Sequence, residues 1–227
     1  MGHSPMIFFD IDGTLVDHRS ASARASLLLY DQFPGAIAFE RLRFPAIWED
    51  ILEKHWGRFS RGEISLPEQR RARLREVFAR PDMPGEEADR RYRVFADEYE
   101  SLVQAYGDAA VCLRALARRP LGIISNGARH QQIAKLERAG FLECFSVMVY
   151  AEDVGLGKPA AEIFLEACRR AGRRPEECVY IGDNVQTDVL PSRALGMRGI
   201  HLSRPPAATR AAPPTLSTLR DLPGMVE

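Results

Sequence analysis

The chain has 227 residues, and its 31 lysine and arginine residues balance 31 aspartate and glutamate residues. This length allows one large domain or a medium domain with a smaller companion. The balanced charge gives no net field to attract nucleic acid, so nucleic-acid binding is not expected. No stretch reaches the length of a membrane span, and the first residues lack the segments of a secretion signal, so we expect no membrane partner and a cytoplasmic location.

The four cysteines support that location. They show no Cys-x-x-Cys spacing and lie among apolar neighbours, as buried free thiols in a reducing compartment would. Neither a disulfide framework nor a zinc site is predicted for Cys112, Cys144, Cys168 and Cys178.

The first predicted element is a strand over the apolar run Met6 to Phe9. From residue 18 to residue 106 the chain contains no convincing strand and shows three or four helical patterns, so it reads as an inserted helical domain. One of these helices is predicted to begin after Ser65, which has capping-box spacing to Glu68, and to run to about Ala79.

Two apolar stripes at helical spacing are expected to form the core of this insertion. One contains Trp48, Ile51, Leu52, His55, Trp56 and Phe59, and the other contains Tyr92, Phe95, Ala96, Tyr99, Leu102, Val103 and Tyr106. Because His55 lies on the first stripe, we interpret it as a hydrogen-bonded core histidine rather than a substrate contact.

After the insertion, short apolar runs alternate with helical patterns, which is typical of a parallel α/β sheet. The strands are predicted at 121–124, 147–149, 179–181 and 200–202, and helices at 129–139 and 162–171 with glycines at their C-terminal ends. A surface loop is expected over 204–215, followed by a last short helix over 216–222.

Asp10 and Asp12 directly follow the first strand, and Gly13 follows them. Side chains two residues apart on a strand share a face, and a glycine there permits a sharp turn close to a ligand. Two carboxylates so placed repel each other unless a cation or proton is present. An Asp-x-Asp-Gly string also occurs in calcium loops and ordinary turns, so the rest of the chain has to decide.

Polar residues also follow two later strands, where an open parallel sheet binds its ligands. Ser125, Asn126 and Gly127 follow one strand, Gly182 and Asp183 follow another with Asp188 five residues on, and Lys158 lies on a glycine-flanked loop between them. Singly, these features could be a turn, a helix N-cap and a solvated surface charge. Together, they suit a phosphoryl group and Mg²⁺, because hard carboxylate oxygens bind magnesium while lysine and serine position phosphate oxygens.

With these residues in place, the chain resembles the haloacid dehalogenase-like hydrolase superfamily, in the branch whose helical cap is inserted after the first motif. Its four motifs occur in family order as Phe9-Asp-Ile-Asp-Gly-Thr-Leu15, Ile124-Ser-Asn-Gly127, Gly157-Lys-Pro159 and Gly182-Asp-Asn-Val-Gln-Thr-Asp188. The resemblance implies a Rossmann-like parallel sheet core with helices on both faces, formed by 1–17 and 107–227, and an all-helical cap over 18–106.

The resemblance also implies roles for the site residues. Asp10 would be the nucleophile that forms an aspartyl phosphate, and Asp12 the general acid and base, with Thr14 orienting the Asp12 carboxyl. Mg²⁺ would be held by the Asp10 carboxylate, the Asp12 carbonyl and Asp183, with Asp188 as a ligand through water or a partner of Lys158. Phosphate would be bound by Thr14, Ser125, Asn126, Gly127 and Lys158.

Within the superfamily, Asp12 favours phosphate chemistry over dehalogenation, because halide leaves without a proton donor. Phosphonate-cleaving relatives use a cap lysine as a Schiff base, but Lys54, the one lysine of this cap, lies off the apolar stripe and reads as solvated. We therefore expect a magnesium-dependent phosphatase acting on a small phosphorylated metabolite. A phosphotransferase or phosphomutase, a dehalogenase and a non-catalytic binding protein are the alternatives. Whether the substrate is a nucleotide, phosphoglycolate or a sugar phosphate stays open, as does the oligomeric state.

Overall fold

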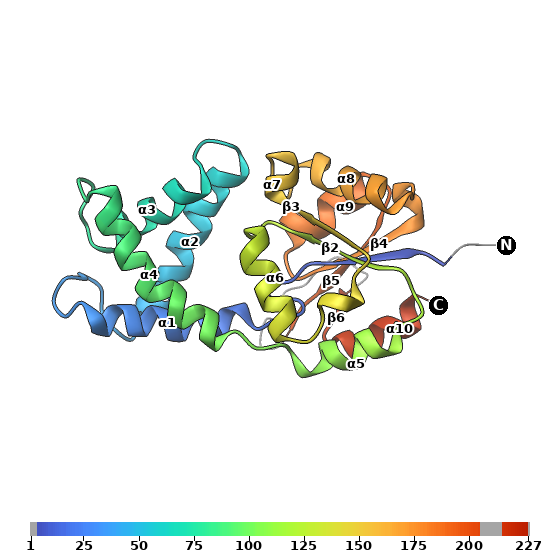
Figure 1. Cartoon of the computed structure of the whole chain (residues 1–227), viewed down its shortest axis with the longest axis horizontal. Helices are drawn as coiled ribbons and strands as arrows, with labels where there is room; N and C mark the ends of the chain where they lie inside the picture. Colours follow the sequence, from blue (N-terminus) through green and yellow to red (C-terminus); the bar gives the residue numbers. More distant parts are fainter. Residues whose placement is uncertain (1–3, 205–214, 227) are drawn as a thin grey trace. The chain divides into compact units, whose positions relative to one another are not determined.

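The computed structural model describes residues 4–204 and 215–226, and the chain divides into two compact units (Figure 1). One combines Met1–Asp17 with Gln104–Glu227, and the other is His18–Val103. The second unit ends three residues before the boundary expected at Tyr106. The reason is local pairing: Ala105 bridges Val16, and the Tyr106 N–H donates to the Leu15 carbonyl at 3.0 Å.

The first unit is built on a six-stranded parallel sheet in the order β3-β2-β1-β4-β5-β6. The strands are β1 (Met6–Phe9), β2 (Leu121–Ser125), β3 (Val147–Tyr150), β4 (Cys178–Gly182), β5 (Arg198–Leu202) and β6 (Thr215–Leu216). The parallel α/β fold predicted from the sequence is confirmed, and each of the five predicted strands is present. The two-residue edge strand β6 was not predicted.

Strand β1 lies at the centre of the sheet, between β2 and β4. All residues of these three strands are buried, as expected for continuous apolar runs covered on both faces. The pairing of Phe9 with Ile181 places the ends of β1 and β4 side by side. The chain leaves β1 toward β2 on one side and reaches β4 on the other, so these ends form the switch point where such sheets bind ligands.

Helices cover both faces of this sheet, with α8 and α9 along one face and α5 and α10 along the other (Figure 1). The α-helices of the unit are α5 (Gly107–Ala115), α6 (Arg129–Arg138), α7 (Ala151–Val154), α8 (Ala161–Ala171), α9 (Leu190–Ala194) and α10 (Leu222–Met225). Shorter turns are η1 (Leu142–Cys144), η2 (Pro175–Glu177), η3 (Val185–Val189) and η4 (Leu219–Asp221).

The helix predicted over 216–222 is wrong. Thr215 and Leu216 instead pair with β5, and helical turns begin only at Leu219 because the Thr218 side chain accepts from the Arg220 N–H and starts a new turn there. Most of the loop expected over 204–215 lies outside the described residues.

The second unit contains four helices, namely α1 (His18–Gln32), α2 (Phe44–Ser60), α3 (Leu66–Val77) and α4 (Gly85–Leu102). Ser65 caps α3 as predicted, with its hydroxyl accepting from the Glu68 N–H at 3.4 Å. The two apolar stripes meet where the Trp48 and Phe95 rings pack with centroids 4.4 Å apart. His55 is buried and its Nε2 lies 2.8 Å from Glu76, which confirms its interpretation as a core histidine.

Among the described residues, no helix is long and apolar enough to cross a membrane. The cysteines are free, and Cys112, Cys168 and Cys178 are buried as predicted. Cys144 is exposed, so its prediction was wrong: it ends the short surface turn η1 and its side chain does not reach the core. Lys54 is also exposed and pairs with Glu76 at 2.8 Å, as expected for a solvated lysine.

Candidate active site

The turn after β1 sets the two aspartates apart. The Asp10 N–H continues the sheet by donating to the Ile181 carbonyl at 2.8 Å. The chain then folds back on itself, with Gly13 at φ +79° and the Ile11 carbonyl accepting from residues 14 to 16. This turn needs glycine, because a positive φ strains other residues. As a result Asp10 is buried at the carboxyl end of the central strand β1, whereas the Asp12 side chain stays 28% exposed.

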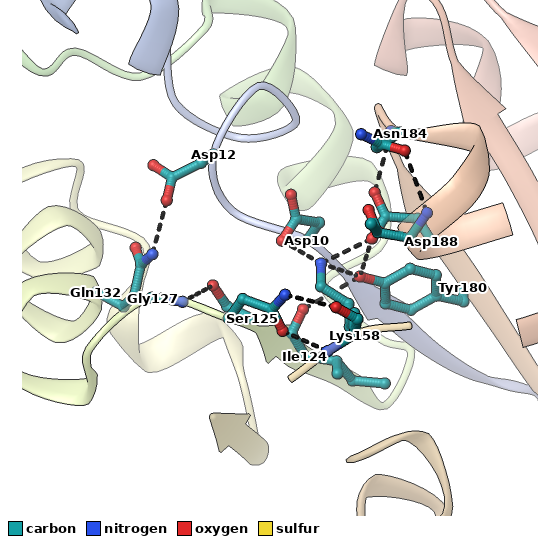
Figure 2. Close-up of polar contacts among 12 residues, drawn as sticks. Asp10, Asp12, Ile124, Ser125, Gly127, Gln132, Lys158, Tyr180, Asn184 and Asp188 are labelled. Carbon is teal, nitrogen blue, oxygen red and sulfur yellow. Dashed lines mark hydrogen bonds and ion pairs between the residues drawn. The ribbon is translucent and has the colours of Figure 1, made fainter. Parts of the chain in front are cut away.

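Lys158 lies at the centre of a buried polar cluster (Figure 2). Its Nζ donates to Asp10 Oδ1 and Asp188 Oδ1, each at 2.7 Å, and to the Tyr180 hydroxyl at 2.9 Å. That hydroxyl also lies 3.1 Å from both Asp188 Oδ1 and the Ile124 carbonyl. Every side chain of the cluster is at least nine-tenths buried, so one ammonium group is fixed against two carboxylates inside the protein.

A third carboxylate, Asp183, completes a group that could hold a metal ion. Among the described residues, Asp10, Asp183 and Asp188 can place ligand oxygens within 4.8 Å of one another. The backbone of Gly13 passes so close to Asp183 that an added Cβ would lie 2.6 Å from its Cγ. Three oxygen ligands of high charge are the donor set that Mg²⁺ prefers, so these residues fit that ion.

The charge balance explains why a cation belongs here. Burial raises the pKa of Asp10 to about 8, although Lys158 acts in the opposite direction. Burial alone would lower the pKa of Lys158, but Asp10 and Asp188 outweigh it and raise that pKa above its usual value. Lys158 contacts Asp10 and Asp188, and a divalent cation held beside them would favour the ionised form of Asp10 that burial disfavours.

The phosphate-binding residues expected from the sequence are only partly brought to this cluster. Ser125 is buried at the end of β2 and accepts from the Gly127 N–H at 3.3 Å. The Asn126 side chain is committed elsewhere: its amide donates to the Lys158 carbonyl at 2.9 Å and its oxygen accepts from the Lys158 N–H at 2.6 Å. Asn126 therefore holds the lysine loop in place.

The role expected for Thr14 as the residue that orients Asp12 is wrong. The Thr14 hydroxyl is buried and has no hydrogen-bond partner among the described residues. Asp12 is held instead by Gln132 Nε2 and Lys135 Nζ, each donating at 2.7 Å. The Thr14 side chain is fully buried in the turn after β1, and no hydrogen bond joins it to the partly exposed Asp12 carboxylate.

Four residues near the site were missed at the level of sequence. Tyr180 is hidden in an apolar strand, and Gln132 and Lys135 lie in a helix that reads as a polar surface element. Arg204 donates to the Gly13 carbonyl at 3.3 Å and to the Thr14 carbonyl at 2.8 Å, bracing the turn after β1. Only Lys135 had a visible signal, since it is one of three lysines in an arginine-rich chain.

Comparison with known proteins places these features in a family context. A family model, haloacid dehalogenase-like hydrolase, matches residues 5–196. A phosphoglycolate phosphatase of Shigella boydii is 29% identical over 87% of this chain and 80% of its own length. A phosphoserine phosphatase of Thermus thermophilus is 31% identical over 70% of this chain and 66% of its own length. A glyceraldehyde 3-phosphate phosphatase of Methanopyrus kandleri is 38% identical, but the chain spans only 36% of that protein.

Solved structures resemble the whole fold. The magnesium-bound HAD-hydrolase YfnB of Bacillus subtilis superimposes with a TM-score of 0.83 at 22% identity, covering 99% of both chains. A 2-haloacid dehalogenase of Pseudomonas syringae gives a TM-score of 0.68 at 27% identity over 97% of both chains. Phosphatases and dehalogenases thus both occur among the proteins similar to this chain. The residues of the site therefore have to distinguish the two reactions.

Proposed function

Because the chain belongs to the haloacid dehalogenase-like hydrolases, we propose that it is a magnesium-dependent phosphatase that acts through an aspartyl phosphate. The observation that carries the proposal is the buried cluster around Asp10, in which Lys158 contacts the carboxylate at 2.7 Å and Asp183 and Asp188 complete a set of metal ligands. A nucleophilic carboxylate beside a lysine and a cation site is suited to attack on a phosphoryl group.

In the proposed reaction, an Asp10 oxygen attacks phosphorus while the bond from phosphorus to the leaving oxygen breaks. Asp12 gives its proton to that oxygen. Water then attacks the phosphorus of the aspartyl phosphate and passes its proton to Asp12, which releases phosphate and restores the Asp10 carboxylate. Mg²⁺, held by Asp10 and Asp183 with the Asp12 carbonyl, would offset the repulsion between the carboxylate and the phosphate.

The substrate's phosphate would be held by groups around Asp10. Lys158 supplies a fixed positive charge, and Ser125 supplies a buried hydroxyl at the end of the neighbouring strand β2. The main-chain N–H of Asn126 follows directly on the same turn, and that of Gly127, which donates to Ser125 Oγ at 3.3 Å, comes next. Asp188 would fix Lys158, whose Nζ donates to Asp188 Oδ1, and it stays a candidate metal ligand, because an oxygen that accepts one hydrogen bond keeps a second lone pair.

Phosphate chemistry is favoured over dehalogenation by Asp12. Halide is a stable anion that leaves without a proton, so a dehalogenase gains nothing from a second acidic side chain here. In this chain that side chain is partly exposed and is held by the Gln132 and Lys135 donors. The magnesium bound to YfnB is consistent with a metal-dependent phosphatase of this fold.

For the substrate, we propose a small phosphomonoester of the cytoplasm. The relatives named above act on phosphoglycolate, phosphoserine and glyceraldehyde 3-phosphate, all short-chain monoesters. The buried thiols at positions 112, 168 and 178 suit a reducing compartment.

The proposal is tested by phosphate release from p-nitrophenyl phosphate and from a panel of short-chain, sugar and nucleotide monophosphates. We expect release that requires Mg²⁺, stops with chelator and returns when Mg²⁺ is restored. A rate that is independent of metal would contradict the proposal. Isomerisation of a sugar phosphate without phosphate release would identify a phosphomutase instead.

The metal site is expected to depend on the missing side chain of Gly13. In Gly13→Ala the new Cβ would overlap Asp183, and a positive φ would strain the backbone. We expect Mg²⁺ affinity to fall at least about tenfold, because ligand orientation is lost, as measured by isothermal titration. The control is Gly172→Ala, which has φ +62° with nothing within 4 Å of the added Cβ. If both variants bind Mg²⁺ equally well, the close packing of Gly13 on Asp183 does not shape the site.

A further inference from the structure

Asp12 is held by two side chains from a single helix. Gln132 Nε2 donates to Asp12 Oδ2 and Lys135 Nζ donates to Asp12 Oδ1, both at 2.7 Å (Figure 2 shows the contact with Gln132). The two donors are three residues apart on α6, so they lie on the same face of that helix. Asp12 lies more than 100 positions before these donors in the chain, so the tertiary fold, and not local sequence, creates the contact.

The two donors are ordered and buried, although they belong to a polar helix. Gln132 is 1% exposed and the Lys135 side chain is 9% exposed. Fixing a lysine side chain costs conformational entropy, so an exposed lysine usually stays mobile in water. Here the ammonium group is instead placed on a carboxylate that borders the candidate active site.

The motif glycine at position 127 makes room for this arrangement. A Cβ at Gly127 would overlap Gln132 Nε2 and lie 2.6 Å from Gln132 Cδ. The Gln132 side chain therefore passes through the space that any larger residue at position 127 would fill. This links the end of β2, where phosphate is expected to bind, to the orientation of Asp12.

We propose that Gln132 and Lys135 are positioning residues that fix the Asp12 carboxyl group for proton transfer to the leaving oxygen. A carboxylate offers about four lone-pair sites, two on each oxygen. The donors occupy one site on each oxygen, which fixes the plane of the group. This inference rests on the proposed function, in which Asp12 protonates the leaving group.

If the two residues position a proton donor, their loss affects substrates according to the leaving group. An alkoxide is strongly basic and needs a proton as the bond to phosphorus breaks. A p-nitrophenolate is stable as an anion and needs almost none. A merely structural role for α6 would lower the hydrolysis of both kinds of substrate equally.

The experiment compares kcat/KM for β-glycerol phosphate and for p-nitrophenyl phosphate, because kcat/KM covers the steps up to formation of the phosphoenzyme. For Lys135→Met and Gln132→Leu we expect a fall of about 10–100-fold with the alkyl phosphate, at or below the low end of the full effect of general acid catalysis because Asp12 itself is kept, and less than about 3-fold with the aryl phosphate. Lys135→Arg keeps a donor and is expected to recover most of the loss with the alkyl phosphate.

Lys54→Met is the matched control, since Lys54 also pairs with a carboxylate at 2.8 Å but lies at an exposed position in the second unit. It is expected to leave both kcat/KM values unchanged. Equal losses on the two substrates, or no loss in either variant, would overturn the inference while leaving the phosphatase in place. A wild-type protein inactive on both would overturn the proposed function, and this inference with it.

Discussion

Asp10→Asn is expected to abolish phosphate release and, in chelator, to make the protein more stable. Removal of the nucleophile should lower kcat by about 10⁴–10⁶-fold, the scale seen when a covalent nucleophile is deleted. The substitution keeps the shape of the side chain and an oxygen that can accept from Lys158. It removes one of the two carboxylates that contact the Lys158 ammonium group.

The stability effect has a definite pH dependence. Because burial raises the pKa of Asp10 from 3.8 to about 8, the folded protein binds a proton more tightly than the unfolded chain in this interval. The contribution of Asp10 to stability is therefore complete below about pH 4 and is lost as the pH rises through 8. Asn carries no such penalty, so its advantage should grow from near zero at pH 4 to roughly 2–5 kcal/mol at pH 8.

Thermal unfolding in chelator at pH 5, 6.5 and 8 measures this trend, with phosphate release assayed on the same preparations. Added Mg²⁺ should stabilise the wild type more than Asp10→Asn and reduce the difference between them, because the ion binds the ionised carboxylate. An Asn variant that is no more stable than the wild type at pH 8 would show that Asp10 is not under electrostatic strain. Retained turnover would show that it is not the nucleophile.

The parts of the site that follow strand ends could be predicted from the sequence. Asp10 and Asp183 come directly after apolar runs, and parallel strands bring their carboxyl ends to one edge. Lys158 stood out because lysine is rare in this chain and this one has a glycine on its N-terminal side. In each case a local sequence pattern identified the residue, and the parallel sheet brings these residues together at one edge.

Residues whose side chains contact site residues far away in the sequence could not be predicted in this way. Tyr180 has the periodicity of any buried strand residue, and nothing local shows that its hydroxyl meets Lys158. Lys135 has the spacing of a solvated helix residue, and its contact with Asp12 depends on the fold bringing α6 to the turn after β1. Asn126 was predicted to bind phosphate because of its motif. Its side-chain amide instead pairs with the Lys158 main chain, because the loop after β2 and the loop that carries Lys158 are adjacent.

The end of the fold shows a similar limit. A strand of two residues has no periodicity to detect, so β6 was interpreted as part of a loop and helix. Its pairing with His201 and Leu202 is set by the neighbouring edge of the sheet rather than by its own sequence. The boundary near Tyr106 was displaced for a related reason, because Ala105 and Tyr106 pair with Val16 and Leu15 although the apolar spacing of the preceding helix continues to Tyr106.

Lys158→Met is expected to have the largest effect on stability. The substitution keeps the length of the side chain but leaves Asp10 and Asp188 buried without their shared cation. Breaking a buried ion pair by removing one partner costs about 3–5 kcal/mol. Activity should fall by at least about 100-fold, as for the loss of one preorganised charge at a reacting centre. Mg²⁺ should stabilise the variant more than the wild type, because the ion then supplies the only positive charge in the cluster.

Two further variants keep this prediction testable if Lys158→Met unfolds readily. Lys54→Met removes an exposed lysine with similar ion-pair geometry and should change stability by less than about 1 kcal/mol. Adding Asp188→Asn to Lys158→Met removes one uncompensated carboxylate and should restore part of the lost stability, a coupling that a double-mutant cycle measures. If Asp188→Asn lowers stability further in that background, the cluster is held by packing and hydrogen bonds, and charge balance does not explain why Lys158 is buried between the two aspartates.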